Sequence, residues 1–177
     1  AAALILRKAV RNGSFIEATC LIANNIDALL RTGIVLKKQI ISRNSVIDNE
    51  WIYQGPNDKR KSEKDIYKKS KEMGIIDADI FNELCSLYNY RNKIVHRFII
   101  SEITIAEMEK FTRIYYDLQK RINKIVFDIE SEQIRLNVGM TRLGNKSSDE
   151  TKELIEFAEG KICKIDYFVK EDLLKKI

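Results

Sequence analysis

The sequence of 177 residues predicts an all-α protein, and three observations support that fold class. Apolar residues recur at spacings of three and four along most of the chain, which is the period of a helix with one buried face. Ser/Thr-x-x-Glu/Asp signatures precede four of these stretches, as in helices that begin with a capping box. The chain also has only seven glycines and one proline, which is few for the many turns of a β-sandwich.

The first half of the chain predicts one long helix followed by a loop. The long helix begins at the Ser14–Glu17 signature, and its apolar pattern continues to Ile41. Asn, Asp, Gly and Pro residues then accumulate in 42–61, where we expect a loop that is interrupted around residues 51–53. The segment 1–6 lacks the basic stretch and cleavage site of a signal peptide.

Three further helices are predicted before residue 140. A short basic helix begins at Ser62 and ends near Gly74, and Asp77 caps the next one. The clearest capping box, at Thr104, opens a very long helix over about 104–136, on the order of 45 Å.

The predicted helices divide the chain into two parts. We expect an up-and-down helical bundle over residues 1–143. We expect a C-terminal helical extension over residues 144–177, packed on the same domain.

Composition and charge exclude several kinds of site. The single histidine, His96, rules out a His-rich metal site within one chain, and no metal or cofactor motif is present. The formal net charge of +5 permits an RNA partner without requiring one. Three cysteines without a C-x-x-C pair predict small buried side chains in a reducing compartment, hence a cytoplasmic protein. No apolar run approaches the length of a membrane span, so we expect no membrane partner.

The helix that follows Asp77 carries an unusual group of polar residues. Arg91 falls in the middle of the apolar stripe of that helix, although an arginine is almost never buried unless it is paired. Asn92 and His96 fall on a neighbouring face. A guanidinium, an amide and an imidazole on one helix predict a site for an anion.

The segment LYNYRNKIVHRF, residues 87–98, resembles the R-x4-6-H signature of the HEPN superfamily. The common form R-N-x-x-x-H matches Arg91, Asn92 and His96. The resemblance implies a small all-α domain that forms homodimers or higher homo-oligomers and acts without a cofactor. It implies a metal-independent endoribonuclease, as in toxins and antiviral defence effectors, with RNA as substrate and a cognate antitoxin or regulatory protein as a further partner. It makes Arg91 and His96 catalytic, with Asn92 in support.

The chemistry of RNA cleavage is compatible with this assignment. Attack by the 2′-OH needs a base, an acid for the leaving 5′-oxygen and a cation beside the phosphorane. Because one chain has one histidine, a two-fold dimer is the simplest way to supply two imidazoles. Arg91 and His96 are about 140° apart on an ideal helix, so they can converge if the helix ends or distorts near Val95, or if the convergence occurs across the dimer axis.

The chain departs from one toxin branch of the superfamily. That branch extends the motif to R-x4-H-x-Y, and a partner nucleotidyltransferase modifies the tyrosine. Phe98 occupies that position here and has no hydroxyl to modify.

Basic residues near the motif are candidates for contact with the RNA backbone. They are Lys93 and Arg97 in the motif segment, and Lys59, Arg60, Lys61 and Lys64 in the preceding basic stretch. Trp51 and Tyr53 are expected either to stack on bases or to anchor their loop to the core.

Two other functions remain open at this level. One is a non-catalytic HEPN-like module that binds RNA, a nucleotide or a partner protein through the same cleft. The other is a structural oligomerisation domain, in which Arg91 would pair with an acid of its own subunit, such as Glu83 or Asp27.

Overall fold

The computed structural model describes residues 2–53 and 60–140. Contacts divide the chain into two compact units, Ala1–Arg142 and Leu143–Ile177, and all described residues belong to the first. The expected C-terminal extension over 144–177 therefore lies outside the described residues.

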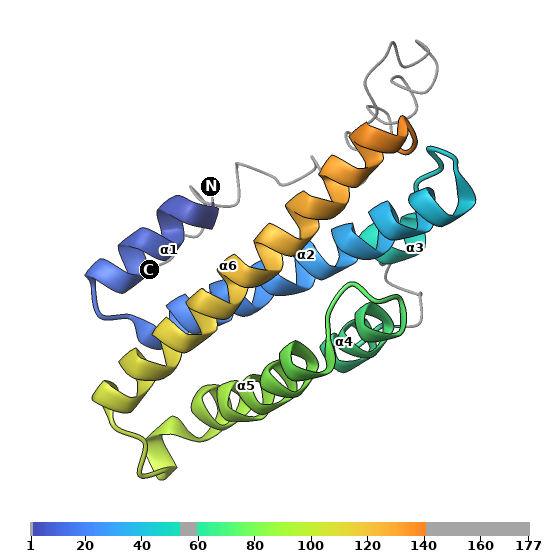
Figure 1. The fold of residues 1–177 in the computed structure, drawn as a ribbon. Coiled ribbons are helices and arrows are strands. Elements are labelled where there is room, and N and C mark those ends of the chain that lie inside the picture. Colours follow the sequence, from blue (N-terminus) through green and yellow to red (C-terminus); the bar gives the residue numbers. More distant parts are fainter. Residues whose placement is uncertain (1, 54–59, 141–177) are drawn as a thin grey trace, which may run out of the picture. The chain divides into compact units, whose positions relative to one another are not determined.

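Helices and loops account for both described ranges, which contain no strand, so the predicted all-α fold class is confirmed (Figure 1). In chain order the helices are α1 (Ala2–Arg11), α2 (Phe15–Ser42), α3 (Asn49–Ile52), α4 (Glu63–Glu72), α5 (Ala78–Arg97), the 3₁₀ turn η1 (Phe98–Ile100) and α6 (Ile105–Leu136).

The two longest helices, α2 and α6, run side by side and form the centre of the unit (Figure 1). They are parallel, because residues near both N-termini meet and residues near both C-termini meet. At one end the buried hydroxyls of Thr19 and Thr112 are 3.0 Å apart. At the other, the buried Gln133 donates to the Leu36 carbonyl and to Gln39 Oε1, each at 2.9 Å. These buried polar pairs fix the register of two otherwise apolar faces.

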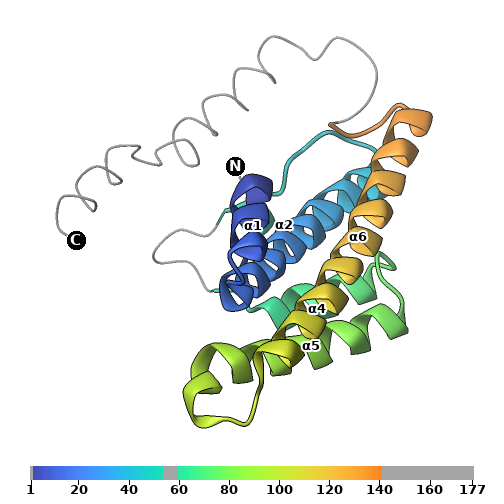
Figure 2. The same cartoon turned by 90° about the vertical axis from the view of Figure 1, so that its left-hand side faces the viewer.

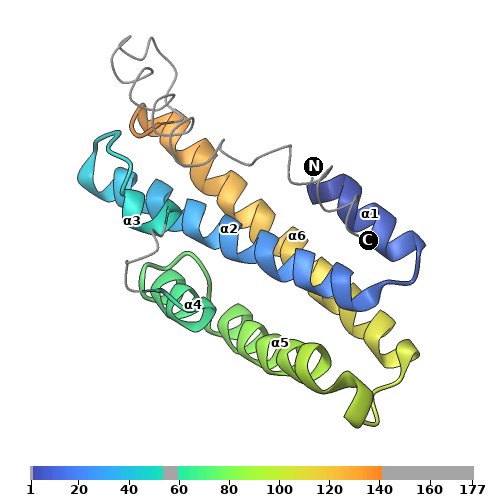
Figure 3. The ribbon, with the colours of Figure 1, turned by 180° about the vertical axis from the view of Figure 1, so that it is seen from behind.

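The remaining helices cover the α2–α6 pair from two sides. Figures 2 and 3 show α1 on one side, with α4 and α5 on the other. The core between them contains the buried apolar residues of all these helices except α1, among them Ile26, Leu30, Ile34, Ile66, Leu84, Ile94, Leu118 and Ile122.

Local capping chemistry explains the starts of α4, α5 and α6. Ser62 and Thr104 each form the full predicted capping box, with Asp65 and Glu107 respectively, and Asp77 accepts a hydrogen bond from the Ile80 amide. The expectation for Ser14 is wrong in one respect. It is the N-terminal cap residue of α2, but with a ψ of 65° its hydroxyl accepts no capping hydrogen bond.

Other sequence-based boundaries are confirmed within a residue or two. The first long helix, whose apolar pattern continues to Ile41, ends at Ser42. The expected interruption of the following loop near residues 51–53 is the short helix α3. The residues before Gly13 form the helix α1.

The expectation that no segment is long and apolar enough to cross a membrane needs correction. By length and composition α2 meets that criterion, with a mean hydropathy of 1.2 over its most apolar 18-residue window. Half of that window is buried within the structure, and core helices of soluble proteins also satisfy the same criterion. Cytoplasmic localisation stays a prediction.

The expected burial of the cysteines is only partly met. Cys20 and Cys85 are half-buried free thiols, and Cys163 lies outside the described ranges.

Candidate functional site

Helix α5 turns Arg91 inward, toward α4. Its neighbours on the same face, Leu84, Leu87 and Ile94, are buried, and the Arg91 side chain is only 14% exposed. The guanidinium lies 5.0 Å from the centre of the Tyr88 ring, in a cation–π arrangement. The sequence argument that an arginine in this stripe must be paired is confirmed by its contact with an acid of α4.

That acid is Glu63, in the first turn of α4. Arg91 Nη2 lies 2.9 Å from Glu63 Oε1, and the Glu63 side chain is 22% exposed. Burial by itself disfavours the charged guanidinium, but the Glu63 carboxylate outweighs this effect and raises the pKa of Arg91. The expected partners Glu83 and Asp27 are wrong, because these acids pair with Arg121 and Arg31 at 2.7 and 2.6 Å.

Two buried tyrosines complete what we call the polar cluster: Glu63, Tyr67, Arg91 and Tyr115. The Tyr67 hydroxyl donates to Glu63 Oε2 at 3.0 Å, and the Tyr115 hydroxyl lies beside it. Burial raises the pKa of Tyr115 to about 12 and that of Tyr67 further still, so both hydroxyls keep their protons at neutral pH. The cluster joins α4, α5 and α6, with one carboxylate balanced by one guanidinium.

His96 lies on a different face of α5 from Arg91. The helix stays regular through Arg97, so the two side chains keep an angular separation of about 140°. The route to convergence by distortion near Val95 is therefore wrong. His96 is exposed, while Asn92 is half-buried. Within one chain the structure does not bring Arg91 and His96 to one point.

Exposed apolar residues occur near His96 in sequence, from the last turn of α5 through η1 to the start of α6. We call this patch the His96 surface: Val95, His96, Ile99, Ile100 and Ile105. Ile99 is 95% exposed and Ile100 is 82% exposed. Lys93 and Arg97 are exposed beside the patch. Where exposed apolar residues form one continuous area, that area is typical of interaction surfaces.

Two of the three described residues of the preceding basic stretch contact other side chains of the chain. Lys61 Nζ lies 3.2 Å from Glu50 Oε2 and 4.7 Å from the centre of the Trp51 ring. Lys64 Nζ lies 4.9 Å from the centre of the Tyr88 ring, whereas Arg60 is exposed. Lys59 lies outside the described residues.

The structure distinguishes between the two expected roles, base stacking and loop anchoring, for Trp51 but not for Tyr53. Trp51 is buried, so it anchors its loop to the core and does not present its ring for stacking on a base. Tyr53 is half-buried.

No metal-binding group of three or more His, Cys, Asp or Glu side chains occurs in the described ranges. Sequence reasoning missed Glu63 and Tyr67 as partners of the motif. A local signal existed, because residues 63 and 67 are four apart on one helix and share a face. The packing of α4 against α5 at Arg91 is a tertiary contact, and no local sequence pattern indicates it.

Comparison with known proteins gives no independent indication of function: no family model, no curated protein and no solved structure matches this chain.

Proposed function

We propose that this chain is a metal-independent endoribonuclease of the HEPN type, acting as a toxin or an antiviral defence effector. The proposed active unit is a homodimer that brings two copies of the motif into one cleft, and the substrate is RNA. A cognate antitoxin or regulatory protein would control it. The match of Arg91, Asn92 and His96 to R-N-x-x-x-H suggests this function.

The observation that carries the proposal is the position of His96. The only imidazole of the chain is exposed near the end of α5, and its sequence neighbours Val95, Ile99 and Ile100 are exposed apolar residues that a second copy would cover. An interface that is related by a two-fold axis places the same patch on both sides. Pairing the His96 surface with itself would therefore bring two imidazoles to the axis.

In this site the two imidazoles share the proton transfers. One takes the proton of the 2′-OH, and the 2′-oxygen attacks phosphorus. The other gives a proton to the 5′-oxygen as the P–O5′ bond breaks. The products are a 2′,3′-cyclic phosphate and a 5′-hydroxyl. Arg91 is held by Glu63 on another face of α5, so it would have to leave that pair to place its positive charge near the phosphorane, while Asn92 would position the imidazole.

The end groups of the cleaved RNA test this function. The full chain is incubated with end-labelled RNA in EDTA, and the 3′ ends are analysed for cyclic phosphate. We expect cleavage to persist without metal and to leave 2′,3′-cyclic phosphates. Absence of cleavage in EDTA, or products with 3′-hydroxyl ends, would contradict the proposal.

A second candidate is a non-catalytic HEPN-like helical module. The Arg91–Glu63 ion pair at 2.9 Å favours it, because a guanidinium held by an acid of its own chain is already partly neutralised. A structural oligomerisation domain would also contain such an ion pair between Arg91 and an acid of its own subunit. Both alternatives predict that the protein leaves RNA intact in the experiment above.

A further inference from the structure

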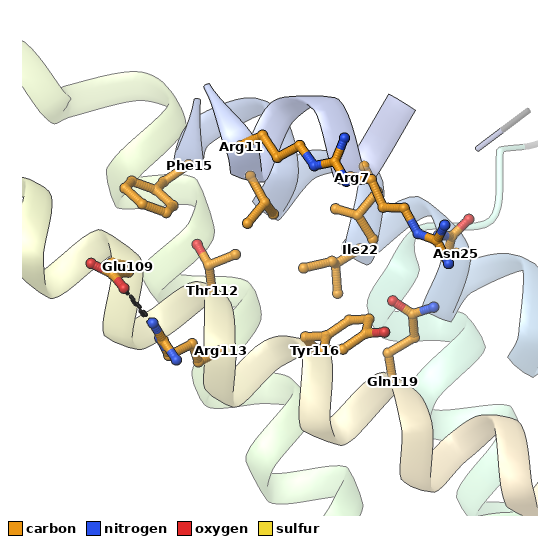
Figure 4. A pocket seen from close by; sticks show the side chains of 12 residues that line it. Arg7, Arg11, Phe15, Ile22, Asn25, Glu109, Thr112, Arg113, Tyr116 and Gln119 are labelled. Atoms are coloured by element: carbon orange, nitrogen blue, oxygen red, sulfur yellow. Dashed lines mark hydrogen bonds and ion pairs between the residues drawn. The ribbon is translucent and has the colours of Figure 1, made fainter. Parts of the chain in front are cut away.

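A pocket of about 550 Å³ lies between α1, α2 and α6 (Figure 4). This volume falls within the range of sites for small molecules. The helix α1 covers the opposite side of the α2–α6 pair from α4 and α5 (Figures 1 and 3). The pocket is therefore separate from the polar cluster and from the His96 surface.

The charged groups of the pocket favour an anion. Three arginines and one glutamate line it, and the glutamate, Glu109, is paired with Arg113 at 2.6 Å. Arg7 and Arg11 are one turn apart on α1, so their side chains emerge on the same face. Among residues 4–53 and 60–140, no salt bridge involves either of them. Two neighbouring guanidinium groups suit the oxygens of a phosphate.

The interior of the pocket suits a flat ring. Leu6, Val10 and Ile22 supply aliphatic surface, and Phe15 and Tyr116 add aromatic rings from α2 and α6. Figure 4 shows Phe15 toward one end of the pocket and Tyr116 toward the other. Aromatic side chains stack on any nucleobase, because every base has a π face.

Two carboxamides add hydrogen-bonding capacity beside the rings. Asn25 and Gln119 line the pocket from α2 and α6, and Gln119 points away from its own helix toward α1 (Figure 4). Gln119 Oε1 is buried and has no hydrogen-bond partner in the structure. Because an unpaired buried acceptor is costly, a ligand that donates to it would bind favourably. Asn and Gln side chains match the donor–acceptor edge of a base such as adenine.

We propose that this pocket binds a nucleoside monophosphate unit. Arg7 and Arg11 hold the phosphate, the aromatic and aliphatic side chains receive the base, and Gln119 pairs with the base edge. The unit is present in a free mononucleotide and at the 5′ end of an RNA strand. The site does not depend on the proposed ribonuclease activity, because it shares no residue with that site.

Calorimetric titration of the full chain with three probes tests whether both halves of the ligand are recognised. We expect AMP to bind at least about tenfold more tightly than adenosine, which lacks the phosphate, or ribose 5-phosphate, which lacks the base. Equal binding of AMP and ribose 5-phosphate would overturn the proposal, since only an anion would then be recognised. Failure of AMP to bind would overturn it as well.

Variants locate the ligand. The double variant Arg7→Gln/Arg11→Gln is expected to bind AMP no more tightly than adenosine, and Gln119→Leu to weaken AMP and adenosine alike. Lys8→Gln is the matched control, because it removes one charge from an exposed position of α1 that does not line the pocket. If Lys8→Gln weakens AMP as much as the arginine variant does, the binding is nonspecific attraction to a basic helix and the proposal is wrong.

Competition distinguishes the two sources of the ligand. A 5′-phosphorylated oligoribonucleotide that displaces AMP, while its unphosphorylated form does not, would identify the end of an RNA strand. AMP binding that neither oligonucleotide affects would identify a free mononucleotide.

Discussion

Replacing His96 with alanine is expected to lower the rate of RNA cleavage by at least about 100-fold, the usual contribution of a general acid or base. The expected effect on folding is small, because His96 is exposed and substitutions at such positions change stability by less than about 0.5 kcal/mol. The measurement is the initial rate of cleavage in EDTA, with the melting temperature of each protein recorded alongside.

A matched control for this variant is Asn123→Ala, at an exposed position of α6 outside the motif. It is expected to cleave RNA at the rate of the unmodified chain. If His96→Ala retains full activity, His96 has no part in the mechanism. If the variant is instead much less stable, unfolding would account for its inactivity.

Replacing Arg91 with alanine is expected to destabilise the fold by about 2–4 kcal/mol. The change leaves the Glu63 carboxylate among buried tyrosines without its cation, and breaking a buried pair in this way is costly. The measurement is the free energy of unfolding from denaturant titration. The matched control is Arg121→Ala, which breaks the more exposed Arg121–Glu83 pair and should cost less than about 1 kcal/mol. Equal costs for the two variants would show that burial of the Arg91–Glu63 pair has no energetic weight.

Cleavage assays on the same proteins separate a catalytic from a structural role of Arg91. Under conditions where Arg91→Ala remains folded, the ribonuclease proposal expects it to be inactive. Glu63→Gln is expected to retain cleavage, because it keeps the guanidinium and removes only its partner. Full activity of folded Arg91→Ala would make Arg91 purely structural, as the alternative functions suppose.

The helix boundaries were predictable because their causes are local. The Thr104 capping box and the Asp77 cap satisfy backbone amides within three residues of themselves, so the residues that decide the boundary are adjacent in sequence. The same logic failed at Ser14, where α1 and the turn at Gly13, with a φ of 70°, set the entry into α2. Backbone geometry, and not the cap side chain, fixes that helix start.

The candidate site was predictable only in part, because its partners come from other elements. The apolar stripe of α5 showed that Arg91 needs a partner, but packing of α4 against α5 decided that the partner is Glu63. Exposure of His96 depends likewise on which face of α5 the other helices cover. The pocket beneath α1 was not predictable, since α6, which is far in sequence from α1 and α2, lines it together with them.

The proposal of a composite site rests on self-association through the His96 surface. The variant Ile99→Asp, at a 95% exposed position, places a charge in that surface without disturbing the core. Phe127→Asp is the matched control, because Phe127 is also apolar and 63% exposed but lies on α6 away from the motif. The measurement is the molecular mass by sedimentation, taken together with cleavage in EDTA. The account predicts that the unmodified chain and Phe127→Asp are active dimers, whereas Ile99→Asp is an inactive monomer. An Ile99→Asp protein that stays dimeric, or a monomer that still cleaves RNA, would contradict it.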